Sequence, residues 1–196
     1  IAGMPSSLDL ILVLKVIILA IMCAVLSSLF CIFMSVVHKL FRKYFKNQYV
    51  RVFAGGVMLV ILNIVLNTTD YNGTGMNIIS QALDGQAKPA AFLLKALFTA
   101  ITIGCGFRGG EIVPSFFVGA TFGCVTGGLM GMDPGFAAAL GMVCFFCGVV
   151  NCPLTPLFLS IELFGVQGIM FFTIGCAVSY MLSGYYSLYN EQKIIY

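Results

Sequence analysis

Charged residues are scarce in this chain of 196 residues. Lysine and arginine together number 10, aspartate and glutamate number 7, and charged residues make up 9% of the sequence against 60% that are hydrophobic. A soluble domain has about 25% charged residues, so this chain lacks the polar surface that a soluble or disordered protein needs. With a mean hydropathy of +1.05, we expect an integral membrane protein that crosses the bilayer about six to eight times.

Signatures of several other functions are also missing. No basic patch is interleaved with exposed aromatic residues, which argues against a nucleic-acid partner. Neither a GxSxG nor an HExxH segment occurs, so an enzyme would have to use Glu111 and Glu162 as an acid pair. Cys144 and Cys147 have CxxC spacing, but a zinc site needs further ligands and the only histidine, His38, is far away in sequence. We therefore expect no catalytic residues, no metal and no cofactor.

Apolar runs and polar breaks divide the chain into candidate helices. The first run, 8–37, is followed by the segment 38–51, which holds half of the basic residues and no acid. By the positive-inside rule we expect 38–51 to be a cytoplasmic loop. Several later runs are too short to cross a bilayer upright and are separated by Gly, Pro or Asn, a pattern that points to a binding site within the membrane; ordinary kinked helices are the alternative. The runs with this pattern are 113–130, 134–150, 153–164 and 167–182, and they follow three earlier candidate helices at 52–66, 76–83 and 90–103.

The segment 104–114, GCGFRGGEIVP, is the most informative for chemistry because it places four glycines and one acid inside the apolar sequence. Gly109 and Gly110 let the backbone approach a ligand closely, and Pro114 suits the first turn of a helix. The free N–H groups of 111–115 and the positive end of the helix dipole would face an anion. The residues alone therefore predict an anion site at the start of this helix, with a tight turn between helices as the alternative.

Three segments together resemble the CLC family of chloride channels and transporters. GEIVPSFFVGA at 110–120 is similar to the family's GxFxP segment, and NCPLTP at 151–156, running into IELFG at 161–165, is similar to its APLTG helix. SLYN at 187–190 resembles the start of the family's last membrane helix. The resemblance covers nearly the whole chain and corresponds to the C-terminal half of a CLC membrane domain. It implies an all-α, inverted-repeat fold that works as a homodimer with one pore per subunit.

The resemblance also implies which groups hold the anion. The matching positions are Gly110, Glu111 and Ile112 at the helix start, where backbone N–H groups would bind it, and the hydroxyl of Tyr189. Tyr186 is a competing match for Tyr189. A buried tyrosine hydroxyl needs a partner in any case, so an interface anchor is the alternative role for Tyr189.

The family's other anion-binding segments are missing. No GSGIP-like or GREGP-like segment is present, so the serine and the gating glutamate that the family uses lie outside these residues. We expect 1–196 to be a single membrane unit, the C-terminal half of a transport domain whose first half belongs to a larger protein or to a separate partner. A non-conducting structural subunit is the alternative of another class.

The acid at position 111 points to a subtype. Gly109-Gly110-Glu111 resembles the fluoride-exporting bacterial CLC antiporters, whereas chloride-type members carry an apolar residue at this place. Val113 departs from that subtype, which often has a threonine there, so a hydroxyl donor is lost. We predict a fluoride/proton antiporter in a bacterial plasma membrane, with the C-terminus and 38–51 cytoplasmic. A chloride-selective CLC channel or a chloride/proton exchanger is the alternative.

The two acids of the later apolar runs have different expected roles. A carboxylate within the membrane is a functional candidate, and beside a bound anion the charged form of Glu111 is disfavoured, so a proton would bind as the anion does. The alternative is a carboxylate that caps the helix and is held ionised by Arg108 or by backbone N–H groups. For Glu162 we expect a structural hydrogen bond at a helix or subunit contact. The homodimer is expected to form through 153–164 and 167–182.

Overall fold

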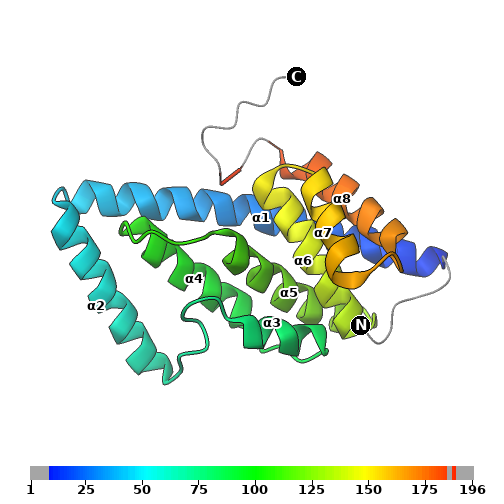
Figure 1. Cartoon of the computed structure of the whole chain (residues 1–196), viewed down its shortest axis with the longest axis horizontal. Coiled ribbons are helices and arrows are strands. Elements are labelled where there is room, and N and C mark those ends of the chain that lie inside the picture. The colour runs from blue at the N-terminus through cyan, green and yellow to red at the C-terminus, as the bar shows by residue number, and fades with distance from the viewer. Residues whose placement is uncertain (1–8, 185–186, 189–196) are drawn as a thin grey trace.

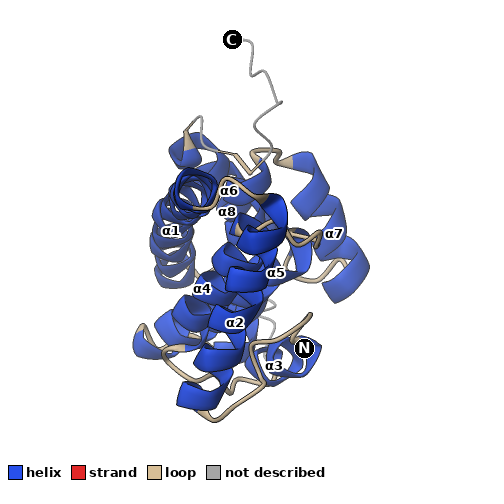
Figure 2. Cartoon of the chain, turned by 90° about the vertical axis from the view of Figure 1, so that its left-hand side faces the viewer, coloured by secondary structure: helices blue, strands red, loops and turns tan. Residues whose placement is uncertain are grey.

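The computed structural model describes residues 9–184 and 187–188, and all regular secondary structure in this part of the chain is helical (Figure 1 and Figure 2). Its helices α1, α2 and α5 are long and apolar enough to cross a membrane, and the prediction of an all-α membrane fold is confirmed. The helices are α1 (Leu10–Tyr44), α2 (Gln48–Leu66), α3 (Met76–Leu83), α4 (Ala91–Gly104), α5 (Ile112–Leu129), α6 (Pro134–Val150), α7 (Leu154–Phe164) and α8 (Ile169–Ser183).

The basic segment 38–51 is mostly helical, and the expectation that it forms a loop is wrong. Helix α1 continues through the basic residues to Tyr44, and α2 begins at Gln48. Lysine and arginine are good helix formers. Arg42 and Lys43 lie in the last turn of α1, where the helix dipole favours positive charge. The connection between the two long helices is therefore short, and the basic side chains are carried on helical turns.

Helix α6 is the centre of the fold. Every residue from Gly135 to Val149 is buried, because α1, α3, α5, α7 and α8 all pack around this helix. A helix that is apolar on all sides is typical of such an enclosed position. Its start is fixed by Asp133, whose Oδ1 accepts a hydrogen bond from the Phe136 N–H at 2.9 Å. Its end is fixed by Asn151, which takes the left-handed conformation at φ 55°.

Helices α5 and α6 touch through their backbones. A Cβ atom at Gly123 would meet the carbonyl oxygen of Ala137, and one at Gly141 would lie 2.5 Å from the carbonyl oxygen of Gly119. Small residues spaced four apart allow this close approach between membrane helices. The contact ties α5 to the most buried helix of the molecule and so fixes the position of the segment that precedes α5.

Helices α1 and α2 lie at the edge of this core (Figure 1). One face of α1 is buried against α4, α6 and α8, whereas Gly55 is the buried residue of α2 and lies against Cys105. The connection between α4 and α5 runs alongside α1, as Figure 1 shows. The predicted anion segment therefore lies between the buried core and the two peripheral helices.

Candidate functional site

The connection between α4 and α5 begins with a sharp turn at the end of α4. The Cys105 N–H donates to the carbonyl of Ile101 at 3.0 Å, as in a continuing helix. Gly106 follows with a φ of 102°, a conformation that favours glycine. Residues 107–110 are then exposed. The backbone thus turns sharply at the end of α4 and reaches α5 through an exposed segment without regular secondary structure.

The start of α5 presents free backbone donors. Pro114 is the third residue of the helix and has no N–H. The Ser115 N–H donates to the carbonyl of Glu111 at 3.2 Å, and its hydroxyl donates to the carbonyl of Ile112 at 2.7 Å. The expectation of free N–H groups through position 115 is therefore wrong for its last two members. In the part of the chain that the structure describes, the N–H groups of Ile112 and Val113 have no protein acceptor, and they point along the positive end of the helix dipole.

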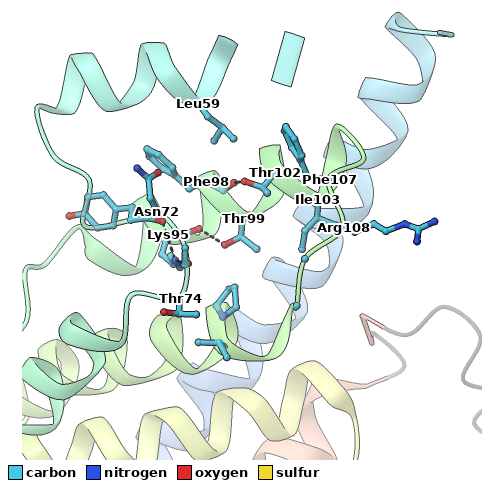
Figure 3. Close-up of a pocket in the computed structure, with 16 residues that line it drawn as sticks. Leu59, Asn72, Thr74, Lys95, Phe98, Thr99, Thr102, Ile103, Phe107 and Arg108 are labelled. Carbon is cyan, nitrogen blue, oxygen red and sulfur yellow. Dashed lines mark hydrogen bonds between the residues drawn. The ribbon is translucent and has the colours of Figure 1, made fainter. Parts of the chain in front are cut away.

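Glu111, the residue before α5, lines a cavity of about 370 Å³ between α1, the end of α4 and Leu188. The carboxylate is half-buried and makes no capping hydrogen bond with α5. Arg108 is exposed and its side chain points away from the connection (Figure 3). The alternative of a helix-capping carboxylate held by Arg108 is therefore wrong. The other residues that line this cavity are Met34, Ser35, His38, Lys39, Ile103 and Leu188.

Both tyrosines expected at the anion, Tyr189 and its competitor Tyr186, lie outside the described residues. The residue before Tyr189 is described: the Leu188 N–H donates to the carbonyl of Val149 at 3.1 Å, and Leu188 lines the cavity of Glu111. The last described residue of the chain is thus anchored on α6 beside Glu111. The contact of Tyr189 with an anion stays a prediction.

A larger pocket of about 610 Å³ lies on the other side of the connection, between α2, α4 and the loop after α2 (Figure 3). Gly109, Gly110, Val113 and Pro114 line it, whereas Glu111 does not. The segment 109–114 therefore separates two cavities, with the acid on one side and the glycines on the other. The polar residues of the larger pocket are Asn72, Thr74, Lys95, Thr99, Thr102 and Arg108.

Lys95 is a buried cation that sequence reasoning missed. Its relative exposure is 1%, and its Nζ donates to the carbonyls of Tyr71 at 3.0 Å and Gly73 at 2.6 Å. The same nitrogen lies 5.1 Å from the centre of the Phe117 ring, an arrangement that stabilises a cation. Lys95 has no acidic partner among the described residues. A lone lysine in the apolar run 90–103 is itself a signal, because ionisable residues inside membranes are usually functional.

We expect Lys95→Met to destabilise the loop after α2. The carbonyls of Tyr71 and Gly73 lose their donor where water is scarce, and each unsatisfied group costs about 1–3 kcal/mol. Thermal unfolding should therefore shift downward, and hydrogen exchange of residues 71–75 should accelerate. Lys88→Met is the matched control, because Lys88 pairs with Asp70 at the surface with its side chain 68% exposed. Equal behaviour of the two variants would show that Lys95 does not hold the loop.

Of the two remaining candidates, Glu162 and His38, one lies in a cavity with Glu111 and the other does not. Glu162 is exposed on α7 and lines neither cavity, so the structure does not bring it together with Glu111 as an acid pair. His38, expected only at the membrane interface, lies in the cavity of Glu111. The signal that could have found it is helical spacing, since residues 34, 35, 38 and 39 share one face of α1.

Comparison with known proteins gives matches over most of the chain. Residues 2–184 match the sequence model of the family described as "Voltage gated chloride channel". A "Chloride/fluoride channel protein" of Pseudomonas syringae pv. tomato is 33% identical over 150 residues, which cover 74% of this chain and 33% of that protein. An uncharacterized protein of Methanocaldococcus jannaschii is 24% identical over 138 residues, covering 68% of this chain and 34% of that protein.

A solved structure is also similar along nearly the whole chain. It is described as a CLC-type fluoride/proton antiporter, and the match has a TM-score of 0.92 and 32% sequence identity. The match covers 97% of this chain and 49% of the solved chain. The chain thus spans about half of the solved chain and about a third of the two relatives above.

Proposed function

Because the chain belongs to the CLC family of voltage-gated chloride channels, we propose that it supplies the C-terminal half of a transport domain that exports fluoride in exchange for protons. The observation that carries the proposal is the start of α5. There the free N–H groups of Ile112 and Val113 lie next in sequence to Glu111, whose carboxylate is uncapped and belongs to a cavity. Donors for an anion and an acceptor for a proton at one helix end are the two parts that coupled exchange requires.

Fluoride is favoured over chloride by the acid at position 111 and by the similar proteins. The relative in Pseudomonas syringae is described as a chloride/fluoride channel protein, and the solved structure as a fluoride/proton antiporter. Val113 is the residue that counts against fluoride. A small, strongly hydrated anion needs many donors to replace its water, and Val113 offers only its backbone N–H. A chloride-selective channel or a chloride/proton exchanger is the second candidate. A non-conducting subunit is the third.

The open backbone at Gly109 and Gly110 supports the expectation that another part of the transport domain completes the site. Apart from each glycine and its two chain neighbours, no heavy atom of the described residues lies within 4 Å of the place where a Cβ would stand. An anion, or the first half of the domain with its own helix ends, therefore has access to this stretch of chain. In this arrangement the basic end of α1 faces the cytoplasm, following the positive-inside rule.

Halide efflux from liposomes that contain the intact protein tests the proposal. Fluoride and chloride electrodes record the release of each anion from vesicles loaded with both. We expect fluoride efflux that exceeds chloride efflux. Chloride efflux alone would favour the chloride-type candidate, and efflux of neither anion would leave the structural subunit.

We also propose that α7 and α8 form the contact of a homodimer. Both helices carry large apolar side chains on the surface of the single chain, and an exposed apolar patch of this kind is typical of an interface or of a lipid-facing surface. Glu162 lies on the exposed part of α7, where a subunit contact would give it a partner. The most exposed apolar residues of α7 and α8 are Leu154 at 62%, Phe158 at 66%, Leu163 at 52%, Met170 at 59%, Met181 at 79% and Leu182 at 53%.

Cysteine crosslinking distinguishes the dimer contact from the lipid surface. Cys152, half-buried while the other cysteines are buried, is first replaced by serine. We expect Phe158→Cys to give crosslinked dimers in membranes, whereas Phe53→Cys on α2, where the side chain is 75% exposed, should not. Dimers from position 53 but not from position 158 would place the interface elsewhere.

A further inference from the structure

A pocket of about 550 Å³ lies at the corner where α1 passes into α2, and its lining is cationic and polar. We call it the basic pocket. His38 and Arg42 are four residues apart on α1 and therefore stand on one face of that helix, and Arg51 faces them from the first turn of α2. The full lining is His38, Arg42, Lys46, Gln48 and Arg51.

The charge of the basic pocket is not balanced by acids. Between Asp9 and Asp70 the sequence has neither Asp nor Glu. Glu111 shares the neighbouring cavity with His38 but does not line the basic pocket. The start of α2 adds the positive end of its dipole. Arg42, Lys46 and Arg51 thus place three cations around one pocket with no acid in its lining, so the pocket favours an anionic partner.

Arg51 is held in place for such a partner. Its Nε donates to the carbonyl of Cys105 at 3.2 Å, and its guanidinium lies against Gly106. A guanidinium that is already oriented loses little freedom when it binds a phosphate through two parallel hydrogen bonds. The same contact ties the basic pocket to the connection that carries the anion segment.

The position of the pocket favours a lipid over a dissolved anion. Helix α1 has 35 residues and is about 52 Å long at 1.5 Å per residue, so its basic end extends beyond a hydrocarbon core of about 30 Å. Tyr44 and Tyr49 are 71% and 86% exposed beside the pocket, as aromatic residues at headgroup level usually are. The lining therefore lies where lipid phosphates lie.

An apolar groove lies along α2, next to the basic pocket in sequence. Its volume is about 460 Å³, and it begins at Val52, the residue after Arg51, and includes Phe107, the residue after Gly106. The other lining residues are Phe53, Gly56, Val57, Val60 and Ile61. A cationic pocket that suits a phosphate, beside an apolar groove on the same helix that suits an acyl chain, has the chemistry of a phospholipid site. We infer that an anionic phospholipid binds here, with its headgroup on Arg42, Lys46 and Arg51 and one acyl chain along α2.

Native mass spectrometry of the intact protein in detergent tests this site. Phosphatidylglycerol is titrated against phosphatidylcholine, whose headgroup has no net charge. A surface cation contributes enough to lipid binding that its loss weakens affinity roughly fivefold. We therefore expect the affinity for phosphatidylglycerol to weaken roughly fivefold in Arg42→Gln and roughly thirtyfold in Arg42→Gln/Arg51→Gln.

Lys43→Gln is the matched control, because Lys43 is exposed on the same turn of α1 but does not line the pocket. Arg42 is also exposed, so its single variant decides the matter even if the double variant fails to fold. Unchanged binding by Lys43→Gln supports the site, and equal weakening in Lys43→Gln and Arg42→Gln would overturn it. Equal retention of phosphatidylcholine, no retention of phosphatidylglycerol, or release of the lipid by excess inorganic phosphate would also overturn it.

Discussion

Glu111→Gln is expected to abolish proton movement driven by fluoride while leaving the folded protein intact. Glutamine keeps the shape of the side chain and can still donate and accept hydrogen bonds, but it has no titratable proton. The carboxylate makes no capping hydrogen bond that the substitution would break, so the helix start should not change. Fluoride and pH electrodes on reconstituted intact protein measure both movements at once.

Glu162→Gln is the control for this experiment. It removes the other acid of the later helices, but Glu162 is exposed on α7 and lines neither cavity. Coupling should survive in Glu162→Gln and fail in Glu111→Gln. Normal coupling in Glu111→Gln would remove Glu111 from the proton path and would favour the chloride-selective channel or chloride/proton exchanger instead.

Gly123→Val in α5 is expected to destabilise the fold strongly. The added side chain would meet the carbonyl oxygen of Ala137, and already its Cβ would lie 2.9 Å from the Cα of Gly141. Both atoms belong to the backbone of α6 and cannot turn aside as a side-chain tip does. Overpacking of a core costs about 1–3 kcal/mol, and we expect the upper end of this range. Thermal unfolding in detergent and the yield of monodisperse protein measure the effect.

Gly128→Val separates this contact from the general cost of valine in a helix. Gly128 lies on the same helix but is exposed, and the atom nearest to an added Cβ is Pro134 Cγ at 4.0 Å. The control should unfold close to the native temperature. Similar unfolding of the two variants would mean that α5 and α6 can separate without loss of the fold.

Local signals in the sequence were enough to place several helices. The predicted run 134–150 coincides with α6 (Pro134–Val150), because Asp133 and Asn151 are typical residues for a helix start and a left-handed end. The basic end of α1 was misread because a charge count does not distinguish a loop from helical turns that leave the membrane. The period of four between Gly119 and Gly123 was available in the sequence and would have predicted the close contact with α6.

The surroundings of Glu111 could not be predicted from its own segment. Free backbone donors at the start of α5 are predictable from Gly109, Gly110 and Pro114, and Ile112 and Val113 provide them. The cavity of the carboxylate, however, is built by Met34 and His38 of α1 and by Leu188, residues that are distant in the chain and meet only through packing on α6. Lys95 was passed over for a similar reason, since its partners are backbone carbonyls that leave no mark in the sequence.

Uphill proton transport by the intact protein tests the central proposal most directly. Liposomes loaded with fluoride and diluted into fluoride-free buffer at equal pH are followed with a pH indicator, with the membrane potential clamped at zero by an ionophore. We predict that outward fluoride flow drives protons into the vesicles until their interior is more acidic than the buffer outside, and that an equal chloride gradient does not. Fluoride flow without proton uptake, or proton uptake driven only by chloride, would contradict the account.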